Sequence, residues 1–133
     1  IVKTWFDNSW IPNTIKLAGE MGYKIFLTTD HGSVKVKKGV RIAGDKQTSS
    51  GVRFKYGNNL NCEHNEGLTI KNPEDYGLPY FTKNTNYIVA KNQNFFVYKT
   101  DYNNYVHKLK NTFQHGGISM EELLIPLIKL THR

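Results

Sequence analysis

The feature that most constrains the fold is a short apolar run that ends in an acid–imidazole pair. Residues 24–29, Lys-Ile-Phe-Leu-Thr-Thr, follow a glycine at position 22 and lead into Asp30-His31-Gly32. A run of this kind is typical of a buried strand in an α/β sheet. The carboxyl ends of strands in open α/β sheets border the crevice where ligands bind. We therefore expect Asp30 and His31 to lie at a functional site.

Local signals predict regular elements on both sides of this run. Asn8 or Ser9 can cap a helix that has Pro12 in its first turn and ends at Gly22. Residues 33–37 alternate apolar and polar side chains and predict a half-exposed strand, with 40–43 as the returning strand of a hairpin. The other expected elements are strands at 52–56, 86–90 and 95–98, a helix at 101–110, a helical turn with capping-box spacing from Ser119, and a closing strand at 123–130 that Pro126 confines to an edge or bulge. The sequence thus predicts one α/β unit with a loop-rich insertion over residues 44–85.

Length and composition limit the class of protein. A chain of 133 residues is in the range of one domain, and it has no apolar run long enough to span a bilayer. The first residues lack an initiator Met and a basic leader, so we interpret the chain as the inside of a longer protein. Its single cysteine, Cys62, indicates a reduced thiol in a cytoplasmic protein. Any bound metal would have to be held by His and Asp.

Positive charge is concentrated in one segment. Of the net charge of +7, residues 33–55 contribute +6. A basic cluster attracts anions such as phosphates, although the solvated face of a hairpin would have the same composition. Our hypothesis is that Arg53 and Lys55, together with Lys46, contact a substrate phosphate or polyanionic tail. The intervening aromatic side chains would then lie on the opposite face of the strand.

Asp30, His31 and His115 are the candidate metal ligands. Zinc accepts carboxylate and imidazole donors, and Gly32 would let the chain turn so that both neighbours reach one ion. His115 lies 84 positions after His31 and precedes two glycines. Taken alone, Asp30 and His31 could form a structural hydrogen bond and His115 could be a surface residue. Their combination matches what an assembled two-metal site requires.

Two segments resemble the PglZ family of the alkaline phosphatase superfamily. They are residues 26–33, Phe-Leu-Thr-Thr-Asp-His-Gly-Ser, and residues 114–126, which begin Gln-His-Gly-Gly. Residues 44–48 and 53–61 are similar to the PglZ effector domain of PorX-type response regulators. The resemblance implies an alkaline-phosphatase-like sheet with flanking helices, of which residues 1–133 form the C-terminal portion.

The resemblance also implies a role for each candidate ligand. Asp30 and His31 would bind the zinc ion next to the nucleophile, and His115 would bind the second zinc ion. A Thr or Ser oxygen would attack phosphorus, and the phospho-enzyme would then be hydrolysed. The nucleophile and the other ligands are expected upstream, so this fragment alone should bind metal weakly and be inactive. The charge favours phosphodiesters, in nucleotides or oligonucleotides, over monoesters.

The same resemblance implies partners and leaves alternatives open. The upstream half of the domain and a receiver domain would accompany this chain, and an exposed sheet edge would favour pairing with a second copy. One alternative is a regulatory or dimerisation module that keeps the fold without catalysis. Another is a basic nucleic-acid-binding domain, which would not explain Asp30, His31 and His115.

Overall fold

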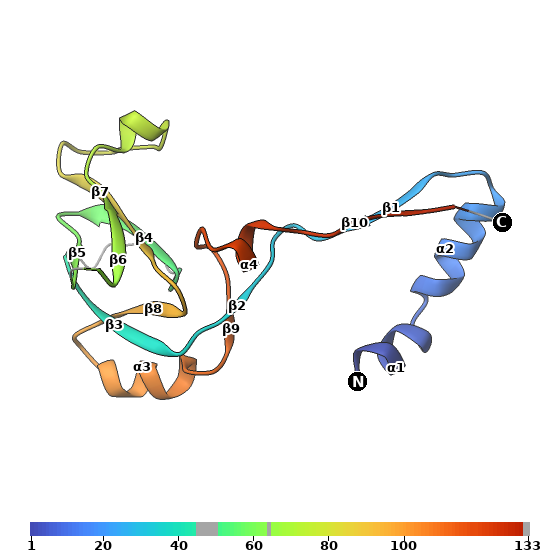
Figure 1. The fold of residues 1–133 in the computed structure, drawn as a ribbon, viewed down its shortest axis with the longest axis horizontal. Coiled ribbons are helices and arrows are strands. Elements are labelled where there is room, and N and C mark those ends of the chain that lie inside the picture. The colour runs from blue at the N-terminus through green and yellow to red at the C-terminus, as the bar shows by residue number, and fades with distance from the viewer. Residues whose placement is uncertain (45–50, 64, 132–133) are drawn as a thin grey trace. The chain divides into compact units, whose positions relative to one another are not determined.

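The computed structural model of the chain describes residues 1–44, 51–63 and 65–131. The chain divides into two compact units (Figure 1). The first comprises Ile1–Asp30 and Ile125–Arg133, and the second comprises His31–Leu124. Both helices and strands occur in each unit, as the predicted α/β class requires.

The first unit contains two helices and a two-stranded ladder. Helices α1 and α2 span Val2–Asp7 and Ile11–Glu20, and β1 (Ile25–Thr28) pairs antiparallel with β10 (Leu127–Leu130). The expected cap at Asn8 or Ser9 is wrong, because Trp10 occupies the N-cap position of α2. Gly22 ends the helix as predicted, with a φ of +81° that favours glycine.

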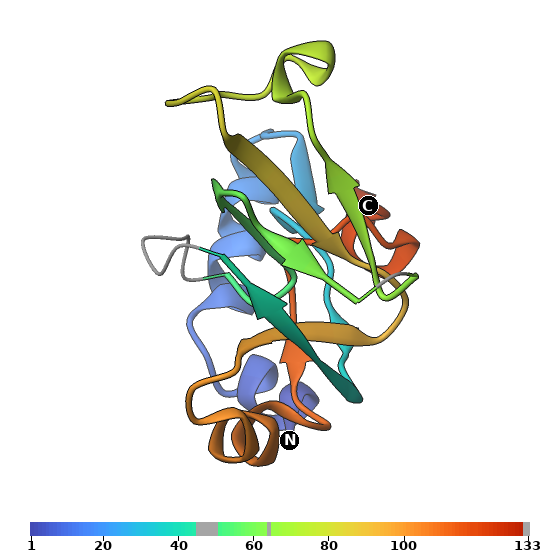
Figure 2. The same ribbon diagram turned by 90° about the vertical axis from the view of Figure 1, so that its left-hand side faces the viewer.

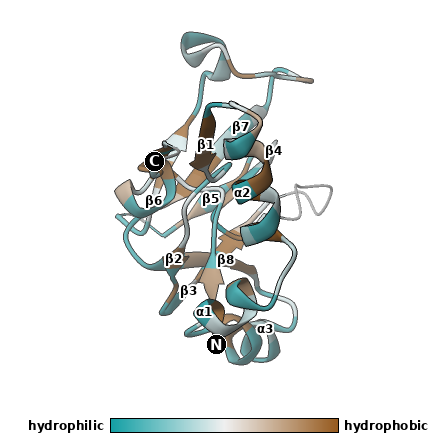
Figure 3. Ribbon diagram, turned by 90° about the vertical axis from the view of Figure 1, so that its right-hand side faces the viewer, coloured by the Kyte–Doolittle hydropathy of each residue, from teal (hydrophilic) through white to brown (hydrophobic). Residues whose placement is uncertain are grey.

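The expectation that β1 is buried is also wrong. Phe26 and Leu27 are 54% and 37% exposed, and the strand appears as a hydrophobic segment in Figure 3. A buried strand needs neighbours on both edges and a layer on each face. In the described residues β1 pairs only with β10.

One sheet of the second unit has the order β5-β3-β8. The central strand β3 (Lys38–Ala43) runs parallel to β8 (Asn94–Tyr98) and antiparallel to β5 (Asn61–Cys62). The predicted hairpin of 33–37 with 40–43 is therefore wrong. Strand β2 (Val34–Lys35) pairs instead with β9 (Phe113–Gln114).

The other sheet has the order β4-β7-β6, with β7 between its neighbours in Figure 2. Its strands are β4 (Phe54–Asn58), β6 (Gly67–Ile70) and β7 (Thr85–Ala90), and all six residues of β7 are buried. Because β4, β5 and β6 all fall within 44–85, the stretch predicted to be rich in loops contributes to both sheets. The remaining elements are a 3-10 helix at Pro73–Tyr76, α3 at Tyr102–Leu109 and α4 at Met120–Leu123.

Two groups of core side chains pack against β8, one on each face. Phe96 packs with Val40, Ile42, Leu60, Ile88 and Ala90, whereas Phe95 and Val97 pack with Val34 and Val36. Successive side chains of a strand point to opposite faces, so β8 joins both groups. None of the helices in the described part of the chain is long and apolar enough to cross a membrane.

Candidate functional site

His31 and His115 lie face to face in the second unit. Their ring centroids are 3.9 Å apart, with 18° between the ring planes. The β2–β9 ladder explains the approach, because Val34 pairs with Gln114 in an antiparallel register. His31 lies just before β2 and His115 just after β9, so both reach the same end of the ladder. The structure thus brings together two of the three predicted ligands.

The His31 ring is oriented by its own backbone neighbour. Its Nδ1 lies 2.8 Å from the Gly32 carbonyl oxygen. A carbonyl oxygen only accepts hydrogen bonds, so Nδ1 is the donor of this contact and Nε2 is the nitrogen through which the ring would bind a metal. Metal-binding histidines usually have this arrangement, in which the second nitrogen donates to a carbonyl or carboxylate.

The donor chemistry of the pair fits zinc. Imidazole nitrogens bind metal in the plane of the ring, so two nearly parallel rings can each serve a separate ion. Zinc needs about four donors. Across the residues that the structure describes, no group of three or more His, Cys, Asp or Glu side chains is placed to hold a metal. Further donors are therefore required for a complete site.

Glu122 forms hydrogen bonds with both of the segments that carry His31 and His115. Its backbone carbonyl oxygen accepts the Gly32 N–H at 2.9 Å, one residue after His31. Its carboxylate accepts the Gly117 N–H at 2.9 Å, two residues after His115, and the Ser119 N–H at 3.1 Å. The last contact belongs to the predicted capping box that begins α4.

Arg53 holds the Glu122 carboxylate in place. Its Nε and Nη2 donate to the two carboxylate oxygens at 3.0 and 2.8 Å, and its Nη1 donates to the Asn94 carbonyl. Arg53 has no exposed surface and Glu122 is 3% exposed. Burial alone would raise the pKa of the Glu122 carboxyl, but the hydrogen bonds from Arg53, Gly117 and Ser119 outweigh it and lower the pKa to about 2.

The position of Gly117 beside the Arg53–Glu122 pair requires a glycine. A Cβ atom at Gly117 would lie 2.5 Å from Glu122 Oε2 and 3.1 Å from Arg53 Nη2. The His-Gly-Gly sequence therefore lets the backbone approach the buried ion pair. Gly116 has a φ of +95°, which favours glycine for a separate reason.

Comparison with family models places residues 10–130 in PglZ, described as the BREX system PglZ alkaline phosphatase-like domain. The match covers nearly the whole chain. The chain belongs to the PglZ family. No curated protein matches it closely enough to count as a relative. The resemblance noted in the sequence is thus confirmed at the level of the family, and with it an alkaline phosphatase-like fold of the phosphoesterase type.

The third predicted ligand of this PglZ chain lies at the boundary of the two units. Asp30 is the last residue of the first unit's N-terminal segment and is exposed. Its Oδ1 accepts a hydrogen bond from Thr29 Oγ1 at 3.3 Å. Its binding of the same ion as His31 stays a prediction.

Arg53 and Lys55, two of the residues predicted to contact a substrate phosphate, are buried in the structure. Arg53 is engaged in the interior ion pair, and Lys55 is 5% exposed with its ammonium 5.2 Å from the centre of the Tyr98 ring. Burial lowers the pKa of Lys55. On this strand the charged side chains point inward and the neighbouring rings of Phe54 and Tyr56 are half-buried. Neither cation is positioned in this structure to meet a substrate. Lys46 lies outside the described residues.

Sequence reasoning missed the role of Glu122 in the PglZ site. The capping-box spacing identified it as a helix-start residue, and such residues are usually solvated. The sequence does contain the two partners: a capping glutamate seven residues after His115, and an arginine of opposite charge in the basic segment 33–55. Their presence does not say that the two residues meet.

Proposed function

We propose that this chain is part of a zinc-dependent phosphoesterase in which His31 and His115 bind the metal. The observation that supports the proposal most is the stacking of two imidazoles 84 positions apart in a chain of the PglZ family. Both histidines are exposed, so their stacking buries little apolar surface. The position of the two imidazoles is explained more simply if they are part of the ligands of a metal site.

Each residue has a distinct part in this proposal. His31 would ligate one ion together with Asp30, and His115 would ligate the other. Zinc at such a site stabilises charge on phosphate oxygens as a Lewis acid. The Gly32 carbonyl would orient the His31 ring, while Glu122 and Arg53 would keep the segments that carry His31 and His115 at a fixed spacing. The nucleophile and the remaining ligands would come from a segment upstream of residue 1.

The proposed substrate is a phosphodiester in a nucleotide or oligonucleotide. The net charge of +7 favours an extended polyanion over a small monoester. We further propose that the domain is the effector of a two-component response regulator, attached to a receiver domain. Both proposals concern a longer protein that would contain this chain.

Zinc titration of this chain by isothermal calorimetry tests the metal site directly. We expect weak binding that is lost in His31→Ala and in His115→Ala. The matched control is His107→Ala, which removes an exposed imidazole from α3. Equal binding by all three variants would contradict the assignment of the pair.

Activity is tested on the full-length protein with a phosphodiester and a phosphomonoester side by side. Hydrolysis that prefers the diester and disappears in Asp30→Ala and His115→Ala would support the phosphodiesterase. A folded, zinc-loaded protein without activity on either substrate would instead favour a PglZ domain retained as a regulatory module.

A further inference from the structure

A cleft in the second unit collects positive charge that the sequence does not reveal. Residues 56–99 contain four lysines and four acids, so their net charge is zero. The fold separates the two signs. Lys71, Lys83 and Lys91 line a cleft of about 880 Å³, whereas Glu63 is the only acid among the described residues that line it.

The other acids are engaged elsewhere or lie outside the cleft. Glu66 accepts hydrogen bonds from Lys38 at 2.6 Å and from Asn94 at 2.8 Å. Glu74 and Asp75 belong to the short 3-10 helix. All three cleft lysines are exposed, and none forms an ion pair with an acid in the part of the chain that the structure describes.

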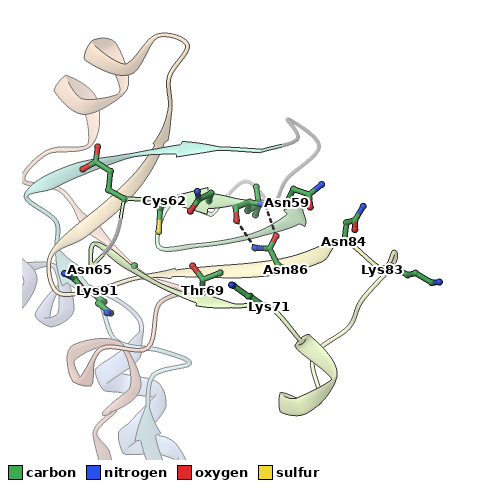
Figure 4. Close-up of a pocket in the computed structure, with 13 residues that line it drawn as sticks. Asn59, Cys62, Asn65, Thr69, Lys71, Lys83, Asn84, Asn86 and Lys91 are labelled. Atoms are coloured by element: carbon green, nitrogen blue, oxygen red, sulfur yellow. Dashed lines mark hydrogen bonds between the residues drawn. The ribbon is translucent and has the colours of Figure 1, made fainter.

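The three lysines are spread along the cleft rather than gathered at one point. Figure 4 shows Lys91 and Lys83 toward opposite ends, with Lys71 between them. Lys83 precedes β7 and Lys91 follows it, and a six-residue strand is roughly 20 Å long. A single phosphate ion could not contact all three ammonium groups. A chain with repeated negative charges could.

Asparagine side chains supply the remaining polar surface. Asn86 holds the backbone of Leu60 in place. Its side-chain Oδ1 accepts a hydrogen bond from the Leu60 N–H at 2.7 Å, and its Nδ2 donates to the Leu60 carbonyl oxygen at 2.8 Å. The other four are exposed, and their amides both donate and accept hydrogen bonds. These four are Asn59, Asn61, Asn65 and Asn84. Such groups complement base edges and sugar hydroxyls, which a purely acidic peptide lacks.

We propose that this cleft binds single-stranded nucleic acid, with Lys71, Lys83 and Lys91 on successive phosphates and the exposed asparagines on bases and sugars. The choice of nucleic acid among polyanions rests in part on the proposed function, but the binding needs neither zinc nor the histidines. A concave cleft accepts one strand, whereas a duplex presents a convex surface. No aromatic side chain lines the described cleft, so base stacking contributes little and phosphate contacts dominate the binding.

Fluorescence anisotropy with a labelled oligothymidylate, in EDTA, tests the proposal. Changing Lys71, Lys83 and Lys91 together to Ala should weaken binding and reduce the slope of log K against log salt by roughly 2, because each single-strand phosphate contact contributes about 0.7. The control changes Lys35, Lys108 and Lys110 to Ala. It removes the same charge from exposed positions outside the cleft.

Cys62 provides a second measurement that needs no variant. It lines the cleft, is half-buried and is the only cysteine of the chain. Burial raises the pKa of its thiol, so alkylation is slow at neutral pH and is followed at alkaline pH. Oligothymidylate should protect Cys62 from iodoacetamide. The matching duplex and polyglutamate should protect it much less.

The outcomes separate this proposal from the proposed function. Equal weakening by the cleft and control variants, or equal protection by polyglutamate, would overturn the nucleic-acid site. His31→Ala and His115→Ala should bind oligothymidylate as well as the unaltered chain does. In the unaltered chain, binding of oligothymidylate without any zinc binding would refute the metal site alone, and zinc binding without oligothymidylate binding would refute the cleft alone.

Discussion

Arg53 and Glu122 form a bidentate ion pair inside the second unit although 69 positions separate them. Arginine matches a carboxylate with two parallel hydrogen bonds, which adds geometric specificity to the charge attraction. Through Glu122 the pair also reaches Gly32 and Gly117, beside the two stacked histidines. Glu122 therefore contacts both the buried Arg53 side chain and the two segments that carry the candidate metal ligands His31 and His115.

Removing the arginine should destabilise the chain strongly. Arg53→Met leaves the Glu122 carboxylate buried without its partner, and breaking such a pair costs about 3–5 kcal/mol. Arg53→Lys keeps the charge but cannot form both bonds, so we expect an intermediate loss. Urea denaturation at neutral pH measures the free energy of unfolding of each variant.

The control for this experiment is Arg41→Met. Arg41 is exposed and stacks over the Tyr102 ring with 4.4 Å to its centre. A cation–π contact at an exposed site is worth about 0.5–1 kcal/mol. Similar losses in the two Met variants would show that the Arg53–Glu122 pair adds nothing beyond an ordinary surface contact.

The Glu122 carboxyl should make stability depend on acid pH. Its pKa is about 2 in the folded chain, against an ordinary value of 4.5. A lowered folded-state pKa stabilises the fold at pH values above 4.5, and this stabilisation is lost as the pH falls from 4.5 toward 2. The shift corresponds to about 3 kcal/mol.

The measurement is a series of urea denaturations between neutral pH and pH 2.5. In Glu122→Gln the group no longer titrates, so the loss of stability over this range should be smaller than in the unaltered chain. Parallel pH curves for the two proteins would mean that other carboxyl groups account for the whole acid response.

The sequence predicted the elements whose signals are local. Gly22 ends α2, the helix at 101–110 appears as Tyr102–Leu109, and the capping box at Ser119 begins α4. Each depends on a few adjacent residues. The sequence also assigned His31 and His115 to neighbouring zinc ions of one two-metal site; the structure places the two rings together, and their metal binding stays a prediction.

What the sequence could not reveal is the pairing of distant segments. Residues 40–43 were assigned to a local hairpin with 33–37, but the strand that contains them, β3, pairs with β8, more than 50 positions away. Arg53 and Lys55 have the composition of a solvated face, and their burial depends on Glu122 and Tyr98 from other elements. Charge alone does not distinguish an exposed cation from one whose partner lies far along the chain.

Lys55 should make stability depend on alkaline pH. It is 5% exposed, and burial lowers the pKa of its ammonium. Lys55→Met keeps the aliphatic length and removes the titrating group, so its stability should change less than that of the unaltered chain between neutral and alkaline pH. A lowered folded-state pKa means that the folded chain releases this proton first, so the unaltered chain gains stability as the pH rises toward 10.5.

Urea denaturation at neutral and alkaline pH compares the two proteins. The stability of the unaltered chain should rise relative to that of Lys55→Met as the pH rises. Lys35→Met, at an exposed position in β2, is the control and should be neutral at both pH values. A large loss of stability in Lys55→Met at neutral pH would mean that the interactions of the ammonium outweigh its desolvation.

The contact between Gly32 and α4 should determine zinc affinity. A Cβ atom at Gly32 would overlap the Glu121 carbonyl oxygen and come within 3.4 Å of the Glu122 Cα. Gly32→Ala therefore forces the His31 segment away from α4, which separates the two imidazoles. Changes that disturb the groups orienting metal ligands typically cost 10–100-fold in affinity, and we expect a loss in this range. Calorimetric zinc titration measures it.

The neighbouring exposed residue provides the matched control. Ser33→Ala makes a change of similar size one position away and should leave zinc affinity unchanged. Thermal unfolding of the two variants separates a local displacement from general destabilisation. A Gly32→Ala chain that binds zinc as well as the Ser33→Ala chain would show that the spacing of His31 and His115 is not set by α4. The link between the buried ion pair and the metal site would then have to be abandoned, while the ion pair's effect on stability would stand.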